Sequence, residues 1–318
     1  MATIIYLVKL FSFLFLGMLL ARLLGPNRFV RATSLFQTAV LWTLLFFMGV
    51  NTGSIPNITG ELASIGLNAL LCSLFAVLGT FVAAFLLVLI LRFRKGDDEP
   101  AVVPVASRKG PNPLRKLWDI FKEPLFLVAI VLAGLLSRLC TPCFDWFDDS
   151  LITYLLYGML TFVGMSLVQQ HVDFRAMFSS PVLLLLPVCT ILGSWLGALF
   201  LPLCTDYGLS HSLGLVSGFG WYSLSGVLIS DLGYPVLGSV SFLSNLFRES
   251  LTFFLIPLLA RLGSRYLFPA VCVAGATSMD VTLPLITNRF GSQAVGAAMF
   301  HGVVISLSAP LLIPLFFR

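Results

Sequence analysis

The chain has 318 residues, of which 58% are hydrophobic and 10% are charged, and its mean hydropathy is +1.00. A soluble domain must cover its surface with polar groups, so this composition excludes an ordinary soluble protein and indicates a polytopic membrane protein. The net charge of +5 does not indicate a nucleic-acid partner, because the basic residues lie in loops beside hydrophobic segments and form no basic face or tail.

The first hydrophobic run, residues 3–24, is predicted to be an uncleaved spanning helix. It carries Lys9 within the run and ends near Arg22, without the small-residue cleavage site of a secretory signal peptide. Five further apolar runs are long enough to span a bilayer. They occupy residues 33–51, 62–91, 124–140, 151–169 and 181–204.

The loop at 92–122 sets the predicted orientation. It contains eight Lys and Arg residues, and basic loops stay on the cytoplasmic side. The termini and the acidic loop 141–150 are then expected on the outer side of the membrane. Cys140 and Cys143 border or lie in that external loop, which leaves a disulfide between them open.

The first six spans read as two inverted copies of a three-helix unit. Residues 20–23, 47–49 and 78–81 match 136–139, 162–164 and 192–195, at offsets of 114 to 116. Because three is an odd number of spans, the second copy must have the opposite orientation, as in many secondary transporters. Residues 1–206 are therefore the candidate scaffold.

A shorter repeat, at an offset of 57, fills residues 207–318. Gly218 matches Gly275, and Ile256 matches Ile313. Each copy has a segment rich in glycine and hydroxyl residues, at 211–231 or 268–287, followed by an apolar span at 238–260 or 293–316. If both rich segments re-enter the membrane, Arg261, Arg265 and Arg289 all lie inside. The sequence thus predicts an all-α fold with about eight spans and two re-entrant hairpins or broken helices.

Re-entrant backbone is tolerated at membrane depth only where it is buried in protein or lines a cavity, so the second repeat is predicted to form the transport site. Glu249 and Asp280 lie in its apolar stretches, and an intramembrane carboxylate usually serves ions, protons or substrate. The other candidate binding residues flank these two acids. They are Ser217, Gly218, Gly220, Trp221, Tyr222, Ser223, Ser225, Asn245, Thr277 and Ser278.

Two nearby residues, Arg248 and His301, are weaker candidates for the site, and a third, Pro284, bears only on the backbone. Pro284 argues against a straight helix through the second rich segment. Arg248 adjoins Glu249 in sequence but does not share its helix face, and His301 is more often a packing residue than a proton relay.

The chain resembles the LysO family of bacterial lysine exporters over nearly its whole length. The resemblance rests on residues 217–226 (SGFGWYSLSG), Arg248-Glu249, residues 275–280 (GATSMD) and His301-Gly302. It implies eight spans, external termini and two acids involved in transport, at the positions of Glu249 and Asp280. The loop around 97–113 departs from the family in length and sequence.

The predicted function is secondary active export of L-lysine, and of close analogues such as thialysine, by proton antiport through Glu249 and Asp280. No enzyme activity, metal or cofactor is expected, and a homodimer is left open. One alternative is a sodium- or proton-coupled transporter of another small solute. The remote alternative is an intramembrane aspartyl protease, which the chain matches poorly because it pairs Glu with Asp and lacks a Gly-x-Gly-Asp motif.

Overall fold

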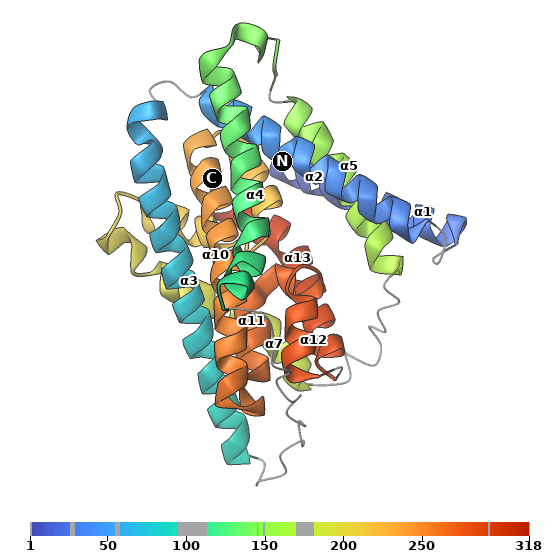
Figure 1. Ribbon diagram of the computed structural model, residues 1–318, viewed down its shortest axis with the longest axis vertical. Helices are drawn as coiled ribbons and strands as arrows, with labels where there is room; N and C mark the ends of the chain where they lie inside the picture. Colours follow the sequence, from blue (N-terminus) through green and yellow to red (C-terminus); the bar gives the residue numbers. More distant parts are fainter. Residues whose placement is uncertain are drawn as a thin grey trace.

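The computed structural model describes residues 2–25, 29–54, 58–94, 113–144, 146–148, 150–169, 181–291 and 293–317, and every regular element among them is helical. Residues 95–112 of the predicted basic loop lie outside these ranges, as do positions 145 and 149 of the predicted external loop. Figure 1 shows the arrangement of the helices. The long ones are α1 (Ala2–Leu24), α2 (Val30–Gly53), α3 (Ile58–Arg94), α4 (Pro113–Cys140), α5 (Ser150–Gln169), α7 (Pro181–Ala198), α10 (Pro235–Leu262) and α13 (Ala294–Phe316).

Six of these helices, α2, α3, α5, α7, α10 and α13, are long and apolar enough to cross a membrane. The apolar part of α4 is the shorter stretch Leu125–Cys140, and α1 has 23 residues and packs along α5. The predicted class, an all-α polytopic membrane protein, is confirmed. Cys140 and Cys143 are both free thiols in this structure.

The first six long helices pack in the pattern that the predicted inverted repeat requires. If the two copies correspond, α1 is equivalent to α4, α2 to α5 and α3 to α7. The α1/α5 contact is then equivalent to the α4/α2 contact, while α3/α7 is its own equivalent. These are the three most extensive helix contacts among the described residues, and Figure 1 shows α1 and α5 running side by side.

Two glycines that match in sequence also match in packing. A Cβ on Gly49 would collide with the carbonyl oxygen of Val131 on α4, and a Cβ on Gly164 would collide with that of Leu14 on α1. Small residues allow membrane helices to approach closely, and van der Waals contact then stabilises the pair. Each of the two glycines therefore allows close contact with a helix of the other copy, α4 for Gly49 and α1 for Gly164.

The first rich segment forms two short helices, α8 (Leu209–Val216) and α9 (Tyr222–Asp231), separated by a break. Both lie along the first half of α10. The Ser241 hydroxyl of α10 donates a hydrogen bond to the carbonyl oxygen of Leu215 (2.9 Å), and α9 packs extensively on α10. Because α8 and α9 lie along the same half of α10, the chain turns back at the break between them. The two short helices therefore have the form of the predicted re-entrant hairpin.

The second rich segment forms α11 (Leu267–Ala274), the short 3-10 helix η4 (Gly275–Met279) and α12 (Leu283–Phe290). It lies along the second half of α10, where Thr252 donates to the carbonyl oxygen of Val273 (3.5 Å). Pro284 occupies the first turn of α12, where the N–H that proline lacks would have no partner within the helix. The prediction that this proline interrupts a straight helix is confirmed.

The tips of the two hairpins meet beside the middle of α10. The backbone N–H of Ala276 donates to the carbonyl oxygen of Phe219 (2.9 Å). Gly275 has φ +64° at this junction, and a Cβ there would collide with the same carbonyl oxygen. Glycine is needed at this position because other residues disfavour left-handed backbone and have no room for their side chain.

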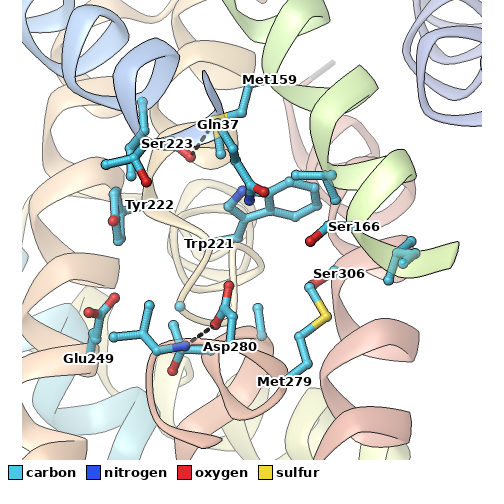
Figure 2. A pocket seen from close by; sticks show the side chains of 18 of the residues that line it. Gln37, Met159, Ser166, Trp221, Tyr222, Ser223, Glu249, Met279, Asp280 and Ser306 are labelled. Atoms are coloured by element: carbon cyan, nitrogen blue, oxygen red, sulfur yellow. Dashed lines mark hydrogen bonds between the residues drawn. The ribbon is translucent and has the colours of Figure 1, made fainter. Parts of the chain in front are cut away.

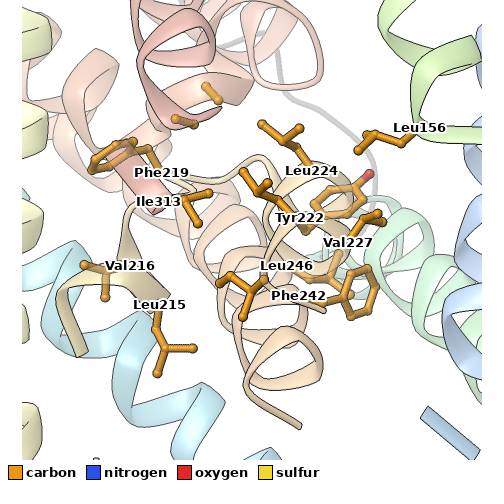
Figure 3. Close-up of a cluster of buried hydrophobic side chains, with 14 of the residues drawn as sticks. Leu156, Leu215, Val216, Phe219, Tyr222, Leu224, Val227, Phe242, Leu246 and Ile313 are labelled. Carbon is orange, nitrogen blue, oxygen red and sulfur yellow. The ribbon is translucent and has the colours of Figure 1, made fainter. Parts of the chain in front are cut away.

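Apolar side chains pack tightly around the first hairpin. Figure 3 shows Leu215, Phe219, Leu224 and Leu246 in one cluster with Ile313 of α13, and all five are fully buried. The burial of these five side chains stabilises one position of the hairpin tip, because a closely packed protein interior leaves no space for rearrangement.

The helices form two groups by contact. In sequence α3 and α7 belong to the first six long helices, yet outside their own pair their main contacts are with α8, α10, α11 and α13. We call α3, α7 and the elements from α8 to α13 the hairpin unit. We call α1, α2, α4 and α5 the four-helix unit, and it touches the hairpin unit more sparsely, through α9, α10 and α13.

Candidate functional site

A pocket of about 440 Å³ lies between the two units, at the meeting point of the hairpin tips. Figure 2 shows side chains of both units around it. The polar lining residues are Ser34, Gln37 and Thr38 of α2, Ser166 of α5, Trp221, Tyr222 and Ser223 of the first hairpin, Glu249 of α10, Thr277 and Asp280 of the second hairpin, and Ser306 of α13.

The structure brings the two predicted acids to this one pocket. Glu249 lies halfway along α10 and is 1% exposed, whereas Asp280 follows η4 and is exposed. One carboxylate oxygen of Asp280 accepts a hydrogen bond from the backbone N–H of Val281 (2.6 Å). The acids therefore differ in setting: one is enclosed by a continuous helix, and the other lies open at a hairpin tip.

The charged side chains that line the pocket, among the described residues, are all acidic. Its described lining contains the two carboxylates and no lysine, arginine or histidine. An opposite charge favours the ionised form of a carboxylate, and a bound cation can supply it. The site is therefore suited to a ligand with net positive charge and disfavours an anion.

Seven of the twelve predicted binding residues line the pocket. Besides the two acids, these are Gly220, Trp221, Tyr222, Ser223 and Thr277. The other five predicted residues are absent from its lining. They are Ser217, Gly218, Ser225, Asn245 and Ser278.

Asn245, on α10 and outside the pocket lining, fixes the position of the first hairpin tip. Its side-chain oxygen accepts a hydrogen bond from the backbone N–H of Gly220 (2.7 Å), and its amide donates to the Ser225 hydroxyl (3.1 Å) and to the carbonyl oxygen of Ser241 (2.9 Å). It is 2% exposed. From this position outside the pocket lining, Asn245 satisfies backbone that the break in the hairpin leaves unpaired.

Ser217 and Ser278 also face away from the pocket. Ser217 donates to the carbonyl oxygen of Leu213 (2.7 Å) and accepts a hydrogen bond from the indole N–H of Trp195 (3.0 Å). Ser278 donates to the carbonyl oxygen of Ala298 (2.8 Å) and lies 3.1 Å from Nδ1 of His301. Their hydroxyls attach the hairpins to neighbouring helices.

Arg248 is buried within the hairpin unit, where its side chain bonds α3, α7 and α11, and it does not line the pocket. Its guanidinium donates to the hydroxyls of Ser194 (2.9 Å) and Thr80 (3.3 Å), the matched residues of α7 and α3, which also bond each other (2.9 Å). It also donates to the carbonyl oxygens of Val273 (3.3 Å) and Cys272 (3.4 Å). These carbonyls end α11, where unpaired oxygens and the helix dipole favour a cation.

Several lining residues were not predicted. Ser34, Gln37, Thr38 and Ser166 are polar residues on otherwise apolar helices, and no motif sets them apart in the sequence. The second repeat does indicate Ser306 in the sequence, because Ser306 stands 57 positions after Glu249, at the offset of that repeat. Applying the repeat to each acid would have found it.

The sequence model of a family described as lysine exporter LysO matches residues 11–102 and 128–317 of this chain. The chain belongs to the LysO family. A relative named lysine exporter LysO, from Escherichia coli strain K12, is 30% identical over 277 residues, which cover 87% of this chain and 88% of that protein. A putative lysine exporter of Haemophilus influenzae is 32% identical over 192 residues, 60% of this chain and 95% of that protein. No solved structure matches the chain.

The LysO match covers every part of the pocket. The lining of α2 falls within residues 11–102, and α5, both hairpins, α10 and α13 fall within 128–317. The interval between the two matched stretches lies around the basic loop, where the sequence departs from the family. The resemblance drawn from the sequence is confirmed, and the protein is a multi-pass transporter of the LysO family.

Proposed function

We propose that this protein exports L-lysine, and close analogues such as thialysine, across the bacterial cytoplasmic membrane in exchange for protons. Family membership and the names of the relatives support lysine as the substrate. The observation that carries the proposal is the charge of the pocket: two carboxylates and, among the described lining residues, no basic side chain.

The pocket chemistry fits the two ends of lysine. Lysine has two ammonium groups and one carboxylate, and Glu249 and Asp280 are the natural partners of the ammonium groups. The carboxylate needs neutral donors. The first turn of α9 reaches the pocket at Ser223, and the N-terminus of a helix presents backbone N–H groups and the positive end of the helix dipole to a carboxylate.

Competition at the acids couples lysine to protons in this proposal. A carboxylate attracts an ammonium group when it is ionised and loses that attraction when it is protonated. Lysine and protons therefore compete for the ionised acids, and the binding of one displaces the other. Glu249, which is enclosed, is the proposed proton site, and Asp280, which is open to the pocket, is the proposed substrate site.

The energetics favour exchange over simple export. An inside-negative potential opposes the exit of a monovalent cation by about 2.3 kcal/mol per 100 mV. Exchange of one lysine for one proton moves no net charge, so the potential no longer opposes export. The pH gradient then drives the cycle.

The position of the pocket supports an inward-facing state. Its α2 residues, Ser34 to Leu41, lie in the first half of that helix, and its α5 residues, Met159 to Leu167, lie in the second half. The predicted orientation puts both halves on the cytoplasmic side. Lysine would enter the pocket from there.

The opposite side is closed by contacts between the two units. Thr52 of α2 and Ser239 of α10 have hydroxyl oxygens 2.9 Å apart, and Thr153 of α5 donates to the carboxylate of Asp231 (3.0 Å). Export would require these contacts to separate. The sequence suggested motion of residues 207–318 against 1–206. Because α3 and α7 pack with the hairpins, we propose that the hairpin unit moves as a whole against the four-helix unit.

A counterflow experiment tests the substrate class. The purified protein is placed in liposomes loaded with lysine, and uptake of labelled lysine is measured with competitors outside. Ornithine and thialysine should compete, whereas norleucine, which has a similar chain without the ε-ammonium group, should not. Equal competition by norleucine, or uptake that requires sodium, would contradict the proposal.

A further inference from the structure

Ser306 is a polar residue of the pocket to which the mechanism above gives no part. It lies on α13, is 6% exposed and lines the pocket. Its hydroxyl has no hydrogen-bond partner among the residues that the structure describes. A buried hydroxyl without a partner costs free energy, and this cost is removed when a ligand supplies the bond.

Other helical serines nearby solve this problem within their own helix. Ser308, two residues later on α13, donates to the carbonyl oxygen of Val304 (2.7 Å), and Ser250 of α10 donates to that of Leu246 (3.0 Å). This bond to the residue four positions earlier is the usual one for a buried helical serine. Ser306 does not make it with Gly302. Its hydroxyl is therefore available to a partner that the described residues do not supply.

The short repeat gives Ser306 a counterpart with a known place in the pocket. Ser306 stands 57 positions after Glu249, and Asp280 stands 57 positions after Ser223. At these two matched pairs of positions, each repeat contributes one acid and one serine hydroxyl to the lining, with the two types exchanged between hairpin and helix. Figure 2 shows Glu249 and Ser306 on opposite sides of the pocket, with Asp280 between them.

We propose that the Ser306 hydroxyl donates a hydrogen bond to the carboxylate of the bound amino acid. The inference rests on the proposed function, because it takes the substrate to be a cationic amino acid. The two acids serve the ammonium groups, and the described lining offers no cation for the carboxylate. A neutral hydroxyl donor meets that need without weakening the attraction of the pocket for positive charge.

The test measures the half-saturating lysine concentration and the maximal rate of counterflow for wild type, Ser306→Ala, Ser306→Thr and Ser308→Ala. Ser306→Ala should raise the half-saturating concentration about tenfold, the effect of losing a hydrogen bond to a charged group, and leave the maximal rate within about twofold. Ser306→Thr keeps the hydroxyl and should stay close to wild type. Ser308→Ala is the matched control on the same helix and should also stay close to wild type.

A fourth variant, Ser306→Asp, tests which end of the substrate lies here. A carboxylate at this position should repel the substrate carboxylate and weaken lysine further, whereas tighter lysine would mean that an ammonium group lies here and would overturn the assignment. Ser306→Ala equal to wild type, or no weaker than Ser308→Ala, would also overturn it. If wild type itself moves no lysine, the proposed function falls, and this inference falls with it.

Discussion

Glu249→Gln and Asp280→Asn should each abolish pH-driven lysine export while the protein remains folded in the membrane. Removing one partner of a desolvated charge pair costs about 2 to 5 kcal/mol of binding free energy, roughly a factor of 30 or more. Each substitution also removes a group that can carry a proton. Export from cells, and efflux from proteoliposomes with an imposed pH gradient, provide the measurement.

The two variants should differ in lysine/lysine exchange, which needs no net proton movement. Glu249→Gln should retain exchange at saturating lysine, because exchange needs no proton site, although the loss of one ammonium partner should raise the half-saturating lysine concentration. Asp280→Asn should lose exchange together with export, because it removes the proposed substrate site. Glu61→Gln, an exposed acid at the start of α3, is the control and should behave as wild type. Normal pH-driven efflux in both pocket variants would refute the roles of these acids.

A cross-link between Thr52→Cys and Ser239→Cys should stop transport almost completely. The two hydroxyl oxygens are 2.9 Å apart, so thiols at these positions are near enough to bond. The bond would hold the four-helix unit against the hairpin unit on the side predicted to face outside. A transporter that cannot open there cannot release lysine, and reduction of the bond should restore activity.

The control pair for the cross-link lies within one unit. Phe13 of α1 and Tyr157 of α5 stack with ring centroids 4.6 Å apart, so Phe13→Cys with Tyr157→Cys can be joined by a short bifunctional thiol reagent. This bridge should leave transport unchanged, because the four-helix unit is proposed to move as one body. The single variants Thr52→Cys and Ser239→Cys should be active as well. Full activity of the cross-linked Thr52/Ser239 pair would exclude the proposed motion.

The sequence was a good guide wherever a local chemical rule decides the structure. Apolar runs located the long helices, and glycines and Pro284 located the breaks, because these residues change backbone preference directly. The cost of intramembrane charge led to Glu249 and Asp280, which do share a pocket. The matched residues Thr80 and Ser194 proved to bond each other, as two equivalent positions near a symmetry axis can.

The sequence was a poor guide to which polar residues face the pocket. Ser217 belongs to the same motif as Trp221, and Asn245 stands four residues before Glu249 on α10. Both nevertheless bond the backbone or a neighbouring helix, because a broken hairpin has unpaired groups that need partners. Gln37 and Ser166 reach the pocket only because α2 and α5 pack against the hairpins. Contacts of this kind depend on the tertiary arrangement, which no local pattern encodes.

The most direct test of lysine/proton exchange through this pocket is efflux from proteoliposomes that hold wild-type protein and labelled lysine. The protein is reconstituted without sodium, and an acidic outside is imposed with the membrane potential clamped at zero. The pH gradient alone should drive lysine out, and imposing an inside-negative potential should leave the rate unchanged, because one lysine exchanges for one proton. Efflux that is indifferent to the pH gradient, or that requires a sodium gradient, would contradict the proposed mechanism.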